Sequence, residues 1–309
     1  MKRKDLLSLK DLEKKEIETI LDLSEKFLEI LKRPIPKVPT LKGKTICNLF
    51  FEPSTRTRLS FELAAKRLSA DVINFTTSTS AILKGESTLD TLKNILAMKV
   101  DMFIVRHSFS GAAHFLAKNT NASVVNAGDG THEHPTQGLL DIFTMRKHLG
   151  GLEGKKVLIV GDILHSRVAR SNLFGLLKLG AEVFLAGPKA LVPDEFERLG
   201  AKILKNIDKE IKEMDVIMGL RIQKERGGAN YIPSFEDYRK FFGITTERLK
   251  LIKEKAIIMH PGPVNWGVEM DYEVSRDKRC VILDQVTNGV AVRMAILFYL
   301  LGTGEIKGE

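Results

Sequence analysis

The chain of 309 residues has few cysteines and no long apolar run. Cys47 and Cys280 are its only cysteines, too few for a disulfide framework or a cysteine-rich zinc site within this chain. Such sparse use is typical of a reducing compartment. No apolar run approaches the ~18 residues of a membrane-spanning helix, and the charged N-terminus lacks the apolar segment of a signal peptide. We therefore expect a cytoplasmic protein without a membrane partner.

Two common nucleotide-binding motifs are missing as well. The Walker pattern GxxxxGK[ST] occurs nowhere in the chain. The segment VLIVGDILHSR has the form of a strand, a turn and a helix start, but it offers Gly161 alone where the GxGxxG motif requires three glycines. The sequence therefore predicts no nucleotide cofactor.

Basic residues outnumber acidic ones, 48 to 39, which gives a formal net charge of +9. A nucleic-acid binder, an enzyme with anionic substrates and a protein with lysine-rich solvated helices would each show such an excess. The lysines alternate with glutamates at helical spacing, as in LEKKEIE at 12–18, and no basic tract is interleaved with aromatic residues. Solvated helix faces and anionic substrates are favoured, and we expect no nucleic-acid partner.

Short buried-strand patterns alternate with helical ones along the chain. A first helix is predicted over 11–32, and a final apolar helix over 288–302. The strand candidates of the first half are TICNLFF (45–51), ADVINFT (70–76), DMFIVRH (101–107) and ASVVNAGD (122–129). Those of the second half are KKVLIVGD (155–162), AEVFLAG (181–187), MDVIMGL (214–220) and AIIMHPG (256–262), with CVILDQ (280–285) as a weaker candidate.

Such alternation predicts the α/β class with parallel sheets. The helix pattern that begins at 138 ends at Gly150–Gly151, which marks a domain boundary. We predict two doubly wound parallel-sheet domains joined by interdomain helices. Ligands of such sheets lie at the carboxyl ends of the strands, so these ends are where site residues are expected.

Hydroxyl and cationic side chains follow the first strand. Ser54, Thr55, Arg56 and Thr57 stand where a strand turns into a helix. A helix N-terminus presents backbone N–H groups to an anion, and arginine adds a fork of donors that matches phosphate. An ordinary N-cap with solvent-facing arginines is the alternative for this stretch alone.

The other strand ends also carry cationic or amide side chains, which disfavours that alternative. They are Lys84, Arg106, His134, Gln137, Arg167, Arg221 and Gln223, together with the proline-locked turn His260–Pro263. His132 and His134 could suggest a metal, but no third ligand accompanies them in the sequence, so we predict no metal site.

The motifs FEPSTRTR, LKGES, VRH, GDGTHEHPTQ, LRIQKER and HPGP together resemble the carbamoyltransferase family, in this order and over nearly the full length. RIQKER with HPGP is similar to the aspartate branch, whereas the SMG and HCLP patterns of the ornithine branch do not occur. The resemblance implies transfer of the carbamoyl group of carbamoyl phosphate to the α-amine of L-aspartate, a step of pyrimidine biosynthesis, without a cofactor. The alternative is a carbamoyltransferase for ornithine or another amino acid.

The resemblance also implies a role for each motif residue. Arg56, Thr57, Lys84, Arg106 and His134 would be catalytic. The residues that would bind carbamoyl phosphate are Ser54, Thr55, Arg56, Thr57, Arg106, His134, Gln137, Pro261 and Gly262. Those that would bind aspartate are Lys84, Arg167, Arg221 and Gln223. The implied domains are 1–149 with a returning C-terminal helix at 286–309 for carbamoyl phosphate, and 150–285 for aspartate.

The implied assembly is a homotrimer with active sites shared between subunits, in which Ser80 and Lys84 enter from the neighbour. Family members also occur with regulatory chains or docked to dihydroorotase, and the sequence does not choose among these. Three features depart from the family pattern. Trp266 stands near a usual arginine, the loop after Arg226 reads GGAN, and His132 is an additional histidine without an assigned role.

Overall fold

The computed structural model describes residues 3–76, 87–222, 231–232 and 234–302. The chain forms two compact units. Unit 1 comprises Met1–Leu140 and Thr287–Glu309, and unit 2 comprises Asp141–Val286. Each unit contains one parallel sheet, so the predicted α/β class with two parallel-sheet domains is confirmed.

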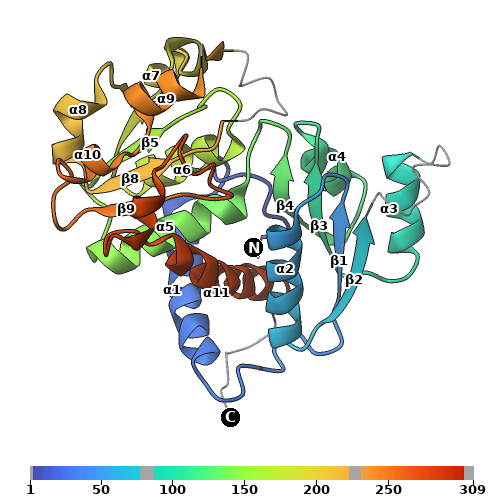
Figure 1. The fold of residues 1–309 in the computed structure, drawn as a ribbon. Coiled ribbons are helices and arrows are strands. Elements are labelled where there is room, and N and C mark those ends of the chain that lie inside the picture. The colour runs from blue at the N-terminus through green and yellow to red at the C-terminus, as the bar shows by residue number, and fades with distance from the viewer. Residues whose placement is uncertain (1–2, 77–86, 223–230, 233, 303–309) are drawn as a thin grey trace. The chain divides into compact units, whose positions relative to one another are not determined.

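The sheet of unit 1 has four parallel strands in the order β2-β1-β3-β4 (Figure 1). They are β1 (Thr45–Phe50), β2 (Asp71–Thr76), β3 (Met102–His107) and β4 (Ser123–Asp129). β3 and β4 are buried along almost their whole length, as expected for strands covered on both faces. The strand order reverses between β1 and β3, and at this switch point the connections that leave the two strands go to opposite faces of the sheet, which leaves room for a ligand.

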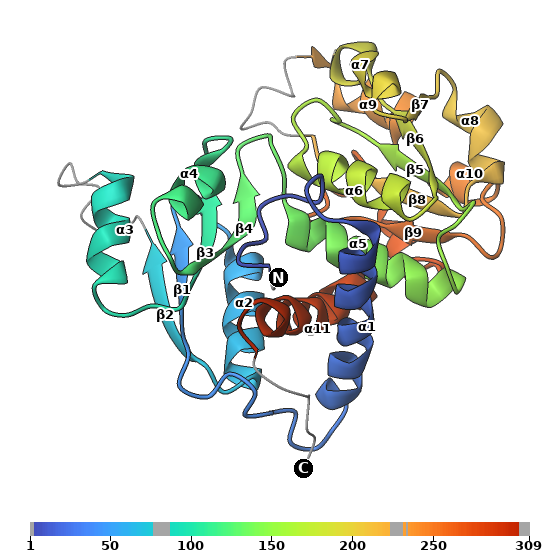
Figure 2. The same cartoon turned by 180° about the vertical axis from the view of Figure 1, so that it is seen from behind.

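The helices that belong wholly to unit 1 are α1 (Lys14–Leu31), α2 (Thr55–Arg67), α3 (Thr88–Leu96) and α4 (Ala112–Lys118). Figures 1 and 2 show α2 and α4 on opposite faces of the sheet, which makes it doubly wound. The N-terminal segment extends along the β4 edge, where Leu6 forms a parallel bridge with Val125. The edge of the sheet is therefore covered by the start of the chain.

Unit 2 has five parallel strands in the order β7-β6-β5-β8-β9. They are β5 (Lys156–Val160), β6 (Glu182–Ala186), β7 (Lys202–Ile203), β8 (Val216–Gly219) and β9 (Ile257–Met259). Its helices are α6 (Arg167–Lys178), α7 (Glu195–Arg198), α8 (Ile207–Glu210), α9 (Phe235–Phe242) and α10 (Thr246–Leu249), with short 3-10 turns at Lys189–Leu191, Ile211–Glu213 and Tyr272–Arg276. Here the order reverses between β5 and β8, which predicts a second ligand-binding edge.

Two long helices contain the division between the units. α5 (Pro135–Leu149) includes the boundary at Leu140, and α11 (Ile282–Leu301) includes the boundary at Val286. The sequence predicts the first boundary after residue 149, nine residues later than Leu140, because the glycine pair Gly150–Gly151 ends the helical pattern. Among the described helices, none is long and apolar enough to span a membrane.

The weaker strand candidate CVILDQ is wrong. Cys280 forms only an isolated bridge with Ile258, and the helix α11 begins at Ile282. A short apolar run has the same pattern in a buried strand and in the first turn of a buried helix. The continuous apolar sequence after residue 288 extends this turn into one long helix.

Candidate functional site

The start of α2 differs from the starts of α3, α6, α9 and α10, which also have a serine or threonine as the N-cap residue. Ser54 is the N-cap residue, with extended backbone angles, but its side chain makes no capping hydrogen bond. The N-cap hydroxyls of α3, α6, α9 and α10 all accept a hydrogen bond from their own helix. The hydroxyl of Ser54 is therefore not engaged in capping at a terminus whose dipole favours an anion.

Three further motif residues form the first turn of α2. Thr55 and Arg56 are exposed, whereas Thr57 is buried. The turn follows directly on β1, at the strand-order reversal of unit 1. The cationic fork and the hydroxyls predicted from the sequence thus stand together at the carboxyl edge of the sheet.

Arg106 is fixed at the same edge by contacts to the two neighbouring strands. Its Nη2 donates to Oε1 of Glu52 at 2.8 Å, and its Nη1 donates to the carbonyl of Ala127 at 3.2 Å. The backbone N–H of Phe51 donates to the Arg106 carbonyl at 2.8 Å, which extends the β1–β3 pairing. With only 12% of its side chain exposed, the guanidinium has a defined position. The positioning residue Glu52 is absent from the sequence prediction, although it stands beside Pro53 in the FEPSTR motif.

His134 and Gln137 follow β4, the next strand of the sheet. His134 is 4% exposed, and its Nδ1 lies 3.4 Å from Oγ1 of Thr136. The backbone N–H of Gln137 donates to the His134 carbonyl at 2.9 Å, in the turn that begins α5. A buried imidazole at a strand end can donate to a substrate oxygen, and the half-buried Gln137 offers both an amide donor and an acceptor.

In unit 2, α6 begins at the strand-order reversal. Ser166 caps this helix by accepting from the backbone N–H of Ala169 at 3.1 Å, and Arg167 is its first residue. The side chain of Arg167 is almost completely buried. A buried guanidinium at a helix start is a strong site for a carboxylate, because the helix dipole and the cation act in the same sense.

Arg221 follows β8 on the other side of this reversal. It is half-buried, and the next residue, Ile222, donates its N–H to Oε1 of Glu269 at 2.9 Å. The backbone N–H of Asn265 donates to Oε2 of Glu269 at 2.7 Å. Burial raises the pKa of the Glu269 carboxyl, although these hydrogen bonds oppose the effect. Glu269 therefore ties the segment after β8 to the segment after β9, and the sequence analysis does not identify it.

The HPGP turn after β9 is held by its own histidine. The N–H of Gly262 donates to Nδ1 of His260 at 2.8 Å, and the N–H of His260 donates to Oε1 of Gln285 at 3.0 Å. Pro261 and Gly262 are half-buried. The turn therefore has one backbone conformation, which fixes the direction of its carbonyl groups.

The predicted site residues fall into two groups, one in each unit. Unit 1 brings together Ser54–Thr57, Arg106, His134 and Gln137 at one sheet edge, and unit 2 contains Arg167, Arg221, Pro261 and Gly262. Ser80, Lys84, Gln223 and the GGAN loop lie outside the described residues. Trp266 is exposed and packs edge-to-face on Tyr272, with the ring centroids 5.6 Å apart.

Neither cysteine is suited to nucleophilic catalysis. Burial raises the pKa of the Cys47 thiol to about 12 and also raises that of Cys280. A thiol with such a pKa carries almost no thiolate at neutral pH.

Two family models match the chain, one on each half. The aspartate/ornithine carbamoyltransferase carbamoyl-P binding domain matches residues 4–147, and the Asp/Orn binding domain matches residues 153–300. The chain belongs to the aspartate/ornithine carbamoyltransferase family. The resemblance of its motifs to this carbamoyltransferase family is thereby confirmed.

Similar curated proteins and solved structures lie on the aspartate side of this carbamoyltransferase family. The aspartate carbamoyltransferase catalytic subunit of Geotalea daltonii is 54% identical over 309 residues, 100% of this chain and 99% of that protein. The subunit of Syntrophobacter fumaroxidans is 56% identical over 301 residues, 97% and 98% of the two chains.

Among solved structures, aspartate transcarbamoylase from Trypanosoma cruzi in complex with carbamoyl phosphate and aspartate is similar, with a TM-score of 0.90 and 32% identity over 97% of this chain and 98% of that one. The catalytic subunit of M. jannaschii aspartate transcarbamoylase has a TM-score of 0.83 and 37% identity, over 97% and 98% of the two chains.

Proposed function

We propose that this chain transfers the carbamoyl group of carbamoyl phosphate to the α-amine of L-aspartate and releases N-carbamoyl-L-aspartate and phosphate, a step towards pyrimidines. The observation that carries the proposal is the anion-binding start of α2, with Ser54 and Arg56 beside the fixed guanidinium of Arg106. Relatives that match over the full length are named aspartate carbamoyltransferase, which supports aspartate over ornithine.

Most of the groups that bind carbamoyl phosphate are assigned to unit 1. Ser54, Thr55, Arg56 and Thr57 bind its phosphate through hydroxyls, backbone N–H groups and a guanidinium. Arg106, Thr57 and His134 donate to the carbonyl oxygen. The carbamoyl amino group is held by Gln137 and by the main chain at Pro261 and Gly262.

Aspartate is assigned to unit 2. Arg167, Arg221 and Gln223 bind its two carboxylates, with Lys84 from a neighbouring subunit. Ornithine would instead require an acidic partner for its side-chain amine, and the arginines after β5 and β8 do not supply one. These side chains suit a dicarboxylate and disfavour a second amine.

The reaction needs no covalent nucleophile of the protein. The neutral α-amine attacks the carbamoyl carbon, and the resulting tetrahedral intermediate carries its negative charge on the former carbonyl oxygen. A C–N bond forms, the C–O bond to phosphate breaks, and the departing phosphate accepts the proton lost by the amine. Each donor aimed at the oxygen contributes on the order of 10²–10³ in rate. His134 acts as such a donor and not as a base.

We further propose that the chain works in the cytoplasm as a homotrimer. In this assembly Ser80 and Lys84 of one subunit complete the active site of its neighbour. The similarity of the LKGES motif, which contains Lys84, to that of carbamoyltransferases supports this proposal.

Carbamoyl transfer from carbamoyl phosphate, measured with aspartate and ornithine as parallel acceptors, tests the proposal. We expect carbamoyl-aspartate and phosphate in equal amounts, and no carbamoyl-ornithine. Turnover with ornithine alone would contradict the assignment of unit 2. Absence of turnover with either acceptor, in protein shown to be folded and trimeric, would contradict the proposed reaction itself.

A further inference from the structure

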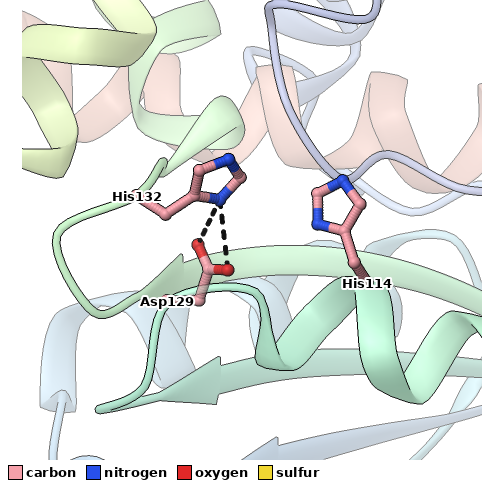
Figure 3. A group of neighbouring side chains, drawn as sticks. All are labelled: His114, Asp129 and His132. Atoms are coloured by element: carbon pink, nitrogen blue, oxygen red, sulfur yellow. Dashed lines mark hydrogen bonds and ion pairs between the residues drawn. The ribbon is translucent and has the colours of Figure 1, made fainter.

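Two histidines and an aspartate, none of them assigned to a substrate, converge in unit 1 (Figure 3). His114 belongs to α4, Asp129 ends β4, and His132 lies in the loop that follows. One ligand atom from each of the three lies within 4.8 Å of the other two. Within the described ranges, no other three histidine, cysteine or acidic side chains converge in this way.

Two of the three ligand atoms are already at the spacing of a metal site. Nδ1 of His132 lies 3.1 Å from Oδ1 and 3.2 Å from Oδ2 of Asp129. A tetrahedral ion with bonds of about 2.0–2.2 Å holds neighbouring ligand atoms roughly 3.3 Å apart. Figure 3 shows a ring nitrogen of His114 directed towards the other two side chains. A movement of about 1–1.5 Å by His114 would complete the tetrahedral spacing.

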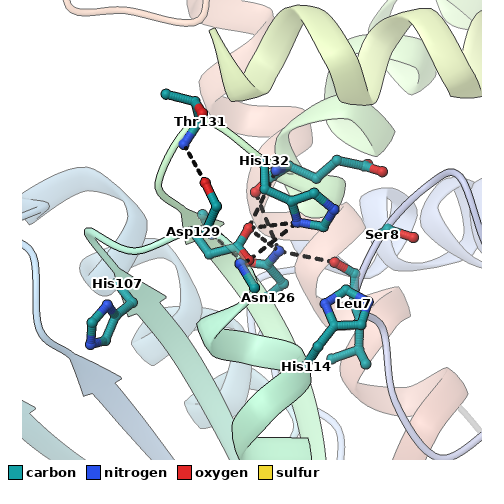
Figure 4. A network of polar contacts seen from close by, with 12 residues as sticks. Leu7, Ser8, His107, His114, Asn126, Asp129, Thr131 and His132 are labelled. Carbon is teal, nitrogen blue, oxygen red and sulfur yellow. Dashed lines mark hydrogen bonds and ion pairs between the residues drawn. The ribbon is translucent and has the colours of Figure 1, made fainter. Parts of the chain in front are cut away.

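The hydrogen-bond partners of these three side chains resemble those usually found around a protein-bound metal ion. The fully buried Asp129 accepts from the N–H of Gly111 and from Nδ2 of Asn126, both at 2.8 Å (Figure 4). Nε2 of His114 lies 3.7 Å from Oδ2 of Asp11, which itself accepts from Oγ of Ser8 at 2.6 Å. A metal-ligating histidine usually donates its second ring N–H to a carboxylate, and Asp11 is placed to accept it.

An ordinary ion pair between His132 and Asp129 is the competing interpretation, and unit 2 supplies a comparison. Nδ1 of His165 lies 2.9 Å and 3.1 Å from the two carboxylate oxygens of Asp162, at the same three-residue spacing. The ring beside His165 is Tyr231, which offers no imidazole nitrogen. At His132 the neighbouring ring is His114, with the ring centroids 5.3 Å apart. The second imidazole distinguishes a metal site from a simple pair.

We propose that His114, Asp129 and His132 bind one Zn²⁺ or a similar divalent transition-metal ion, with water as the fourth ligand. Imidazole and carboxylate donors suit such ions. The ion would join α4 to the loop that leads into His134, and it would therefore act as a structural clamp on this part of unit 1. About a third of each histidine side chain is exposed, 35% for His114 and 34% for His132, so an ion can enter from solvent.

Zinc titration of the untagged, chelator-treated full-length protein tests the site. We expect one Zn²⁺ per chain, and an affinity reduced roughly 100-fold or more in His114→Ala and in His132→Ala. Asp11→Asn should reduce it about 10-fold, because it removes only the acceptor behind His114. His165→Gln is the matched control, since it breaks a histidine–aspartate pair of the same spacing, and its zinc affinity should equal that of the wild type.

A second measurement separates loss of a ligand from loss of fold. Bound Co²⁺ should give the intense visible absorption of a tetrahedral site in the wild type and not in His114→Ala, while both proteins retain the same far-UV circular dichroism. Zinc should raise the melting temperature of the wild type and leave that of His114→Ala unchanged. Equal zinc affinity in the wild type and His114→Ala, or no stoichiometric binding by the wild type, would overturn the proposal.

Discussion

Arg56 is the side chain on which the proposed phosphate site at Ser54–Thr57 should most depend. Replacing it with alanine removes a fork of donors from a helix start that otherwise offers hydroxyls and N–H groups. We expect Arg56→Ala to lower kcat/KM for carbamoyl phosphate by about 10²–10³, as measured by initial rates. Because Arg56 is exposed, the free energy of unfolding should change by less than about 0.5 kcal/mol.

Lys66 provides the control on the same helix. It is exposed in the last turn of α2, at the opposite end of the helix from Arg56, and its Nζ lies 2.7 Å from Oε1 of Glu62. Lys66→Ala also removes one positive charge from α2, yet it should leave kcat/KM within about a factor of two, because screened charges at that separation interact weakly. Equal losses in both variants would mean that the net charge of the helix, and not a specific contact, matters.

Asp271 should make the stability of unit 2 dependent on pH. Burial alone would raise the pKa of this carboxyl, but hydrogen bonds from Arg239 and Thr246 outweigh it and hold the pKa below its ordinary value. Arg239 binds both carboxylate oxygens, at 2.7 and 2.8 Å. A carboxyl with a lowered folded-state pKa stabilises the fold above its unfolded-state pKa of ~3.9, and this contribution is lost as the pH falls further.

We therefore expect Asp271→Asn to lower the free energy of unfolding by about 1–3 kcal/mol at neutral pH. The difference from the wild type should shrink as the pH falls below ~3.9, because the unfolded chain then binds a proton first and the native carboxyl becomes protonated only at lower pH. Urea denaturation at a series of pH values measures it. If the difference in free energy of unfolding between the two proteins stayed constant from neutral to acidic pH, the charge of Asp271 would not be what stabilises this region.

The sequence identifies the residues assigned to substrates more readily than the residues that hold them. Arg56, Arg106 and His134 stand at strand ends in recognisable motifs, so their place along the chain is enough to select them. Glu52 contacts a residue that lies 54 positions away in the sequence, and Glu269 contacts one that lies 47 positions away. No local sequence pattern indicates such pairs. Distance in sequence also conceals His114, which stands in α4, whereas His132 lies in the loop after β4.

At the scale of elements, the residue that follows β5 is a glycine because no side chain fits at this position. Gly161 has a φ of +141°, and a Cβ added to it would lie 2.8 Å from the carbonyl oxygen of Leu220. Leu220 follows β8, the neighbouring strand, so the two strand ends approach closely at the reversal of strand order. The glycine that fails to form a GxGxxG motif therefore has a structural role in bringing β5 close to β8.

Gly161→Ala should lower the free energy of unfolding by about 1–3 kcal/mol, through backbone strain and the contact with Leu220. Chemical denaturation measures this loss. Gly151→Ala is the control, because a Cβ there meets nothing within 4 Å and the backbone angle is not in the left-handed region. If both variants had the same stability, close approach of the strand ends would not be the reason for Gly161.

Elements with a long, strongly patterned sequence are predicted well, and short ones are not. The eight principal strand candidates all contain a strand, because each is a short, largely apolar run bounded by polar or glycine residues. β7 contains only Lys202 and Ile203, which is too short for any periodicity. CVILDQ fails for a different reason, since its pattern also fits the start of α11.

For the whole molecule, the important property is that unit 1 is built from both ends of the chain. Phe298 of α11 packs edge-to-face on Phe27 of α1, and Arg293 lies over the ring of Phe61 at 5.0 Å. Hydrophobic residues 294–297 are completely buried. Periodicity alone cannot assign a helix to a domain. The assignment of 286–309 to the first domain comes with the family resemblance, as does the division of substrates between domains.

We expect residues 141–286 to fold alone with one cooperative thermal transition, and residues 1–140 not to do so. The second fragment lacks the C-terminal helix, so large apolar side chains such as Phe27 and Phe61 would lose their partners. Fusion of residues 287–309 to residue 140 through a flexible linker should restore a cooperative transition. Calorimetry of the three proteins checks this, and a cooperative transition for residues 1–140 alone would contradict it.

The discontinuity of unit 1 also sets an order of events during synthesis. When residue 140 is added to the growing chain, roughly 170 residues are still to come, and they take on the order of 10–30 s to add. The covered β4 edge can form early, because Leu6 and Val125 are both present by then. The core of unit 1 cannot close until α11 emerges, after all of unit 2. The N-terminal half of this protein is thus synthesised first and completes its folding last. During translation its exposed apolar surface is accessible to chaperones.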